Sequence, residues 1–160
     1  MFFQFLLQFL PTETNKMKNI LLISGPNLNL LEKRENSHYP QTKLLDVVNE
    51  CKSHAKQFDI IITHFQSNHE GAIIDKIHEA ITNDEFESIM INAGAYSHTS
   101  IAILDALNIY RGIVIEIHFS DIEKREKFRQ HSFISLRANK LFKGEGLKSY
   151  IKAIDYLRGI

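Results

Sequence analysis

The fold is decided most clearly by one stretch of the sequence, Gly112-Ile113-Val114-Ile115-Glu116-Ile117-His118-Phe119-Ser120. Its run of branched apolar residues is typical of a strand buried on both faces of a parallel sheet. Because side chains alternate along a strand, Glu116 and His118 leave the same face. The pattern indicates either an acid/base pair at the carboxyl end of the strand, where open α/β sheets bind ligands, or a polar strand end that enters solvent.

Apolar and amphipathic segments alternate along the rest of the chain. We expect strands at 20–23, 60–65, 88–91, 112–117 and 139–142, and a charged turn of helix at 123–129. Helices are expected at 42–57, 71–81, 99–107 and 146–157, the third of them with an N-cap within 97–99. Such alternation implies right-handed crossovers between parallel strands. The sequence therefore predicts an α/β fold, a flavodoxin-like doubly wound five-stranded parallel sheet with helices on both faces, formed by residues 17–160 as a single domain.

Residues 1–16 differ from this pattern. Their apolar part, residues 2–10, is shorter than the roughly 20 residues that span a bilayer. It also lacks the leading basic residue and the following small-residue cleavage site of a signal peptide. We interpret the segment as an N-terminal extension outside the core, upstream of a natural start near Met17; the alternative is an apolar arm that packs on a neighbouring subunit.

Composition narrows the possible partners. Lys+Arg and Asp+Glu number 19 each, and this balance gives no support for binding to nucleic acid or to a membrane surface. With Cys51 as the one cysteine, the chain can form neither an internal disulfide nor a zinc cluster of cysteines, and a cytoplasmic location is expected. Neither a P-loop nor a GxGxxG motif follows the first strand, so nucleotide binding is not supported.

Polar residues follow three of the predicted strands. Asn27 comes after the first strand, Asn92 and His98 after the third, and Glu116 and His118 end the fourth. Because the carboxyl ends of parallel strands meet at one edge, we expect these five side chains to converge there. They can serve acid/base chemistry; alternatively, His98, His118 and Glu116 can form a metal site of two histidines and one carboxylate.

The loop after the first strand carries a second candidate group. Tyr39 lies near Arg34, whose positive charge favours the phenolate and would let the tyrosine act as a general base. The alternative is a surface aromatic. A loop of roughly 15 residues inside a compact domain is more often a functional lid than a simple connection.

An anion pocket is predicted after the fourth strand. The backbone amides of Phe119 and Ser120 precede the charged turn and can face an anion. Arg125 and Arg129, four residues apart, can share a face of that turn. The alternative is a solvated helix whose arginines pair with neighbouring carboxylates.

Six motifs, in this order and spacing, resemble type II 3-dehydroquinate dehydratase: GPNLNLL at 25–31, RExxxY at 34–39, FQSNHEG at 65–71, NxGAYxHTS at 92–100, EIHxS at 116–120 and RExFR at 125–129. The resemblance covers residues 17–160. It implies a flavodoxin-like fold and a dodecamer built from trimers. It also implies anti elimination of water from 3-dehydroquinate through an enolate to 3-dehydroshikimate, in the shikimate pathway of aromatic amino-acid biosynthesis, with no metal, organic cofactor or Schiff base.

The resemblance also assigns roles to individual residues. The catalytic set would be Tyr39 as the base, Arg34 to keep it ionised, Asn27 to hold a water that stabilises the enolate, and His118 as the acid, oriented by Glu116. The substrate-binding set would be Asn92, His98 and Arg129 for the hydroxyls, Phe119 and Ser120 for the carboxylate, and Asp105, which would reach a neighbouring subunit's site.

The sequence departs from the family pattern at a few positions. Glu32 and Pro40 stand where the family commonly has glycine, and Asn36 stands where it commonly has proline. These changes are expected to stiffen or redirect the lid. The last glycine-rich turn is altered at Lys148, and residues 1–16 have no family counterpart. Two other hypotheses stay open: a non-catalytic module that binds a small polyol acid, and a metal-dependent lyase.

Overall fold

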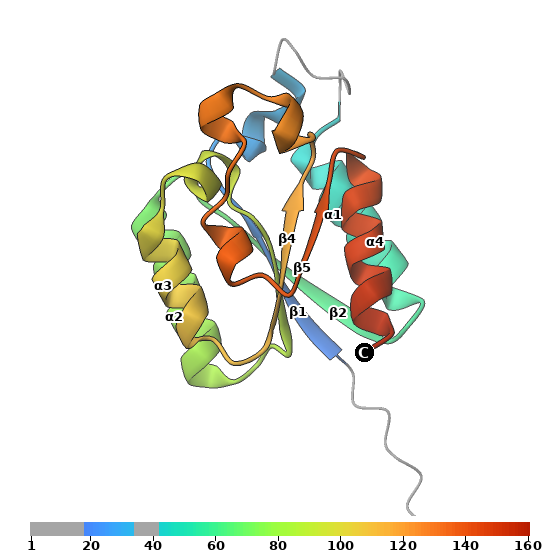
Figure 1. Ribbon diagram of the computed structural model, residues 1–160. Coiled ribbons are helices and arrows are strands. Elements are labelled where there is room, and N and C mark those ends of the chain that lie inside the picture. Colours follow the sequence, from blue (N-terminus) through green and yellow to red (C-terminus); the bar gives the residue numbers. More distant parts are fainter. Residues whose placement is uncertain (1–17, 34–41) are drawn as a thin grey trace, which may run out of the picture.

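The computed structural model describes residues 18–33 and 42–160, which form a parallel sheet with helices on both faces (Figure 1). The strand order is β2-β1-β3-β4-β5, that of flavodoxin-like sheets, and the predicted fold class is confirmed. The strands are β1 (Lys18–Ser24), β2 (Ile60–Gln66), β3 (Ser88–Asn92), β4 (Ile113–His118) and β5 (Lys140–Lys143). The N-terminal extension 1–16 and residues 34–41, which include Arg34 and Tyr39 of the predicted lid, lie outside the described residues.

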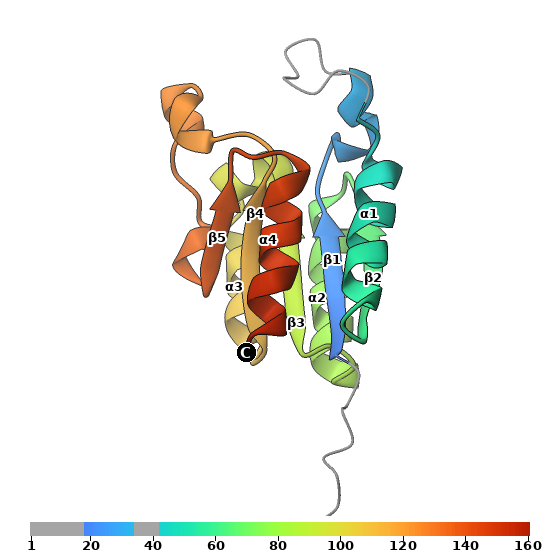
Figure 2. The same ribbon diagram turned by 90° about the vertical axis from the view of Figure 1, so that its right-hand side faces the viewer.

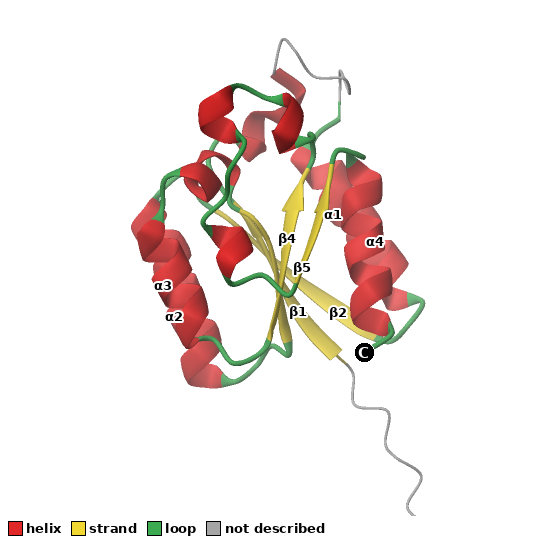
Figure 3. Ribbon diagram, in the orientation of Figure 1, coloured by secondary structure: helices red, strands yellow, loops and turns green. Residues whose placement is uncertain are grey.

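Two helices cover each face of the sheet (Figures 2 and 3). On one side are α1 (Leu44–Lys56) and α4 (Leu147–Arg158), and on the other are α2 (Glu70–Asn83) and α3 (Ile101–Ile109). The side chains of β4 alternate between the two cores: Ile115 and Ile117 pack toward α1 and α4, whereas Val114 packs toward α2 and α3. Within the described ranges, no helix has the length and hydropathy that crossing a membrane requires.

The sheet buries its central strands more than its edge. Residues 20–24 of β1 are buried, whereas β2, at the edge, buries Ile60 and Ile62 and exposes Ile61 between them. The buried residues of α1 recur at helical spacing and face the sheet; they are Leu44, Val47, Val48, Cys51 and Ala55. Cys51 has no exposed surface. Burial, with a smaller effect of Glu50, raises the pKa of Cys51 to about 12, so the thiol is packed and unreactive.

Short 3₁₀ helices occupy the carboxyl edge of the sheet, and here the sequence predictions need correction. The charged segment 123–129, predicted as one turn of helix, forms two 3₁₀ turns, η3 (Ile122–Lys124) and η4 (Lys127–Arg129). Extended backbone at Arg125 separates them. Asp121 is the N-cap of η3, and its carboxylate accepts a hydrogen bond from the Glu123 backbone amide.

The third helix also begins later than predicted. Residues 94–98 form the 3₁₀ helix η2 (Gly94–His98), and α3 starts at Ile101. Its N-cap is Ser100, whose hydroxyl accepts from the Ile103 amide at 2.9 Å, and not a residue of 97–99. Two further 3₁₀ helices are η1 (Leu28–Lys33), inside the segment predicted as a loop, and η5 (Ile134–Leu136), before β5. Helix η1 forms because Leu28 and Leu31 are buried against the core.

Candidate active site

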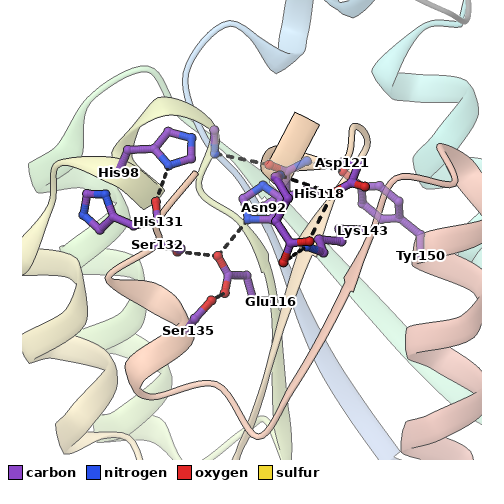
Figure 4. A network of polar contacts seen from close by, with 12 residues as sticks. Asn92, His98, Glu116, His118, Asp121, His131, Ser132, Ser135, Lys143 and Tyr150 are labelled. Atoms are coloured by element: carbon purple, nitrogen blue, oxygen red, sulfur yellow. Dashed lines mark hydrogen bonds and ion pairs between the residues drawn. The ribbon is translucent and has the colours of Figure 1, made fainter. Parts of the chain in front are cut away.

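The end of β4 carries the pair that the sequence places on one face (Figure 4). His118 Nε2 and Glu116 Oε1 are 2.7 Å apart, and the exposed fractions of the two residues are 5% and 0%. Glu116 lies inside the sheet, in register with Ile91 of β3 and Leu141 of β5. When His118 donates its Nε2–H to this carboxylate, Nδ1 is the ring nitrogen left for a ligand.

A buried carboxylate is costly unless hydrogen bonds satisfy it. Besides His118, Glu116 accepts from the hydroxyls of Ser132, at 2.5 Å, and Ser135. Burial pushes the pKa of Glu116 upward, but the bonds from His118, Ser132 and Ser135 outweigh it and hold this pKa below its usual value. Glu116 is therefore ionised near neutral pH and can stabilise a positive charge on His118.

His98 lies parallel to His118 on the same edge. The two rings are stacked with centroids 6.3 Å apart and planes 12° from parallel. His98 Nδ1 donates to the His131 carbonyl at 2.6 Å, which leaves Nε2 as the free ring nitrogen. Burial lowers the pKa of His98, and the nearby side chains of His118, Arg129 and His131 lower it further. The hydrogen bond to the His131 carbonyl raises this pKa and so opposes them in part. His98 is thus favoured as a neutral ring with a fixed tautomer.

Both polar atoms of the Asn92 side-chain amide, at the end of β3, are hydrogen-bonded. Its Nδ2 donates to the Tyr150 hydroxyl at 2.8 Å, and its Oδ1 accepts from the Gly94 amide at 3.2 Å. The Tyr150 ring, fully buried on α4, also packs against Phe119 with centroids 5.6 Å apart. Tyr150 thereby joins two of the predicted site residues from the other side of the sheet.

Asn27 follows β1 in a left-handed conformation (φ 65°) and is exposed. The backbone amide of Asn27 donates to Asn68 Oδ1 at 2.9 Å. The chain just before Asn27 is fixed to the end of β3, because the Gly25 backbone amide donates to the Asn92 backbone carbonyl at 2.8 Å. A side chain at Gly25 would have its Cβ 2.2 Å from the Ala93 carbonyl oxygen. This close approach of the β1 and β3 loops explains the glycine and brings Asn27 to the same edge as Asn92.

The loop after β4 carries the predicted anion-binding groups. Arg125 Nη1 donates to the Ser120 hydroxyl at 3.4 Å. Arg125 Nε and Arg129 Nε lie 3.4 and 3.3 Å from Glu126 Oε2, so the arginines form the ion pairs of the alternative interpretation. Both nevertheless belong to the segment that follows His118 directly in the chain.

A family model described as dehydroquinase class II matches residues 18–158. The chain belongs to the class II dehydroquinase family. It is similar to the 3-dehydroquinate dehydratase of Cereibacter sphaeroides (48% identity over 135 residues, 84% of this chain and 90% of the relative) and to the catabolic 3-dehydroquinase of Emericella nidulans (47% over 140 residues, 88% and 90%). The crystal structure of the type II dehydroquinase from Butyrivibrio crossotus superimposes with a TM-score of 0.83 at 45% identity, covering 88% of this chain and 97% of the other.

The family resemblance assigns three further residues to the site: Arg34, Tyr39 and Asp105. Arg34 and Tyr39 lie outside the described residues. Asp105 lies on the exposed side of α3, and the structure gives it no bond to Glu116 or His118 among the described residues.

The metal-site alternative is not supported by the side-chain arrangement. Across residues 18–33 and 42–160, no three His, Cys, Asp or Glu side chains are grouped so that they could hold an ion. In the proposed trio, the Glu116 carboxylate already accepts hydrogen bonds from His118, Ser132 and Ser135.

Sequence reasoning missed Ser132, Ser135, His131 and Tyr150. Ser132 lies just before the 3₁₀ helix η5 and Ser135 lies within it, on either side of the buried Ile134, and neither periodicity nor a motif marks them. Tyr150 reads from the sequence as an apolar position of the last helix. The useful signal would have been the buried charge itself, because a carboxylate inside a sheet requires donors from elsewhere in the chain.

Proposed function

We propose that this chain dehydrates 3-dehydroquinate to 3-dehydroshikimate in the shikimate pathway. One observation carries the proposal: a chain of the class II dehydroquinase family holds a buried imidazole–carboxylate pair, His118 and Glu116, at the ligand-binding edge of its sheet. This pair has the chemistry of an acid that protonates a leaving hydroxyl.

The elimination requires one base and one acid. The proposed base, the Tyr39 phenolate favoured by Arg34, takes the proton next to the ketone, and the C–H electron pair moves into an enolate. The enolate then re-forms the ketone, the C–C double bond forms, and the C–O bond breaks on the opposite face. His118 Nδ1 gives its proton to the departing hydroxyl, which leaves as water, and Glu116 stabilises the imidazolium until then.

The remaining site residues are proposed to bind and orient the substrate. Asn27 would hold the water that stabilises the enolate, and the Phe119 and Ser120 amides would bind the carboxylate. The substrate hydroxyls would contact Asn92, His98 and Arg129. In support, His98 stacks beside His118, and the Asn92 and Asn27 segments are joined at the same edge.

We further propose a cytoplasmic dodecamer built from trimers, with Asp105 completing a neighbouring subunit's site. Helix α3 supports this because Ile101 and Ile109, one helical face with Asp105 between them, are 55% and 60% exposed. Leu136, on the neighbouring η5, is 75% exposed. Sedimentation at low salt tests the state: Ile109→Lys is expected to give smaller species, and an unchanged sedimentation coefficient would argue against this face as an interface.

The test of function is an assay for the ultraviolet absorbance of the conjugated enone, with enzyme treated with a chelator or with borohydride. We expect activity that survives both treatments. Loss on chelation would favour a metal-dependent lyase, and quinate binding without enone formation would favour a binding module. Tyr39→Phe should nearly abolish turnover, whereas its control Tyr156→Phe, remote on α4, should not; an active Tyr39→Phe enzyme would remove the assigned base.

A further inference from the structure

One short segment, residues 131–136, contacts both His98 and Glu116, the hydrogen-bond partner of His118 (Figure 4). We propose that Ser132 and Ser135 are positioning residues for the elimination. They hold the Glu116 carboxylate in the one orientation in which it accepts the Nε2–H of the His118 imidazolium, so that the second N–H, on Nδ1, faces the substrate. The proposal rests on the proposed function and adds two residues to it.

The two oxygens of the Glu116 carboxylate accept hydrogen bonds from different donors. Glu116 Oε1 accepts from both His118 Nε2 and the Ser132 hydroxyl, while Oε2 accepts from the Ser135 hydroxyl. A carboxylate with one bond can rotate about its terminal torsion, but bonds at both oxygens from opposite sides fix that torsion. The two serine hydroxyls therefore fix the orientation of the Glu116 carboxylate independently of His118.

The serines are themselves held by the fold. Ile134, between them, has no exposed surface and packs into the core of α2 and α3. The Phe133 amide donates to the Ser97 carbonyl at 2.8 Å, which fixes the segment to η2. The neighbouring His131 carbonyl accepts from His98 Nδ1. One segment thus fixes the hydrogen-bonding pattern of His98 directly and that of His118 through Glu116.

Loss of a serine hydroxyl leaves the buried carboxylate short of a donor. Glu116 can then rotate away from His118 or take up a proton. In either case the His118 imidazolium loses the charge that stabilises it, and the neutral ring no longer prefers the Nε2–H tautomer. Because nothing in this step touches the substrate, the rate of the acid-assisted step should fall while substrate binding changes little. Within residues 18–33 and 42–160, the charged or titratable groups from other elements that act on His98 beside His118 are Arg129 and His131, and neither is among the hydrogen-bond donors to Glu116.

The experiment combines kinetics with a measurement that needs no turnover. Ser132→Ala and Ser135→Ala are each expected to lower kcat about tenfold, and the double variant about 100-fold, with KM within about threefold of wild type. The acidic and basic limits of the kcat profile against pH should also move. Ser135→Thr, which keeps a hydroxyl, should restore most of the rate. Ser88→Ala is the control, because it also removes one serine hydroxyl, but from the amino end of β3, at the opposite edge of the sheet from His118.

Nitrogen-15 NMR of the ligand-free enzyme reads the His118 tautomer directly. We expect Nε2–H in wild type and in Ser88→Ala, and a mixture of tautomers in the serine variants. A single variant is enough for this test, since Ser135 is an exposed residue and its truncation opens no cavity.

Three results separate the possibilities. An unchanged tautomer and unchanged kcat would overturn the proposal. A lower kcat with an unchanged tautomer and pH profile would also overturn it, because it would indicate only a structural role. A wild-type enzyme that forms no enone would refute the proposed function, while the tautomer measurement would still decide the roles of Ser132 and Ser135.

Discussion

Glu116→Gln replaces the buried carboxylate with a neutral amide of nearly the same shape. The 2.7 Å bond to His118 Nε2 then loses its charge, and the amide NH₂ competes with its oxygen for the position facing the ring. A hydrogen bond to a charged group is worth about 1.5–3 kcal/mol, and Glu116 has no exposed surface through which solvent could replace it. If that energy stabilises the imidazolium, kcat should fall roughly 10- to 150-fold.

The enone assay measures this effect, with Glu79→Gln as the control because Glu79 is an exposed partner of Lys76 on α2. KM should change little in both variants. A Glu116→Gln enzyme with kcat within twofold of wild type would refute the reasoning, since it would mean that the carboxylate charge does not support the acid.

The same substitution has a consequence for stability against pH. The pKa of Glu116 is lower in the folded protein than its unfolded value of about 4.3. Its ionised form therefore stabilises the fold above that value, and the contribution is lost as pH falls through the lower folded pKa. Urea unfolding should show wild type losing stability more steeply than Glu116→Gln below about pH 4; parallel curves would contradict the assigned hydrogen bonds.

Three further predictions concern the frame around the site. Gly25→Ala should lower the free energy of unfolding by about 1–3 kcal/mol, because its Cβ would meet a backbone oxygen, whereas Gly71→Ala, with open space around it, should change it by less than about 1 kcal/mol; equal urea midpoints would be inconsistent with the close loop contact. Tyr150→Phe should cost about 1–3 kcal/mol by leaving Asn92 Nδ2 without its acceptor, and an unchanged midpoint would rule this out. Ellman's reagent should label Cys51 only as fast as the chain unfolds, and rapid labelling of the native protein would contradict its burial.

The sheet could be predicted because its strands are near-continuous apolar runs that leave few alternatives. The face shared by Glu116 and His118 followed from the period of a strand, and their 2.7 Å contact confirms it. Capping was predicted less well, since 97–99 and Ser100 offer similar residue types and only the backbone path decides which hydroxyl meets an amide. The charged segment 123–129 was misassigned because its composition suits a helix while Arg125 is held extended between two turns.

The serines that bind Glu116 were beyond sequence reasoning for a different reason. Ser132 and Ser135 lie 16 and 19 residues from Glu116, before and within the short helix η5. The packing of Ile134 and the bond from the Phe133 amide to the Ser97 carbonyl bring them to the carboxylate. Partners of a buried charge are set by tertiary structure, so the sequence predicts that they must exist and not which residues they are.

The most direct test of the account is enone formation from 3-dehydroquinate by wild type and by His118→Ala, with His78→Ala, an exposed residue of α2, as the control. The account predicts rapid enone formation by wild type and the control, and turnover reduced at least about 100-fold in His118→Ala, with the fold intact by circular dichroism. A folded His118→Ala enzyme with near-wild-type turnover would contradict the account.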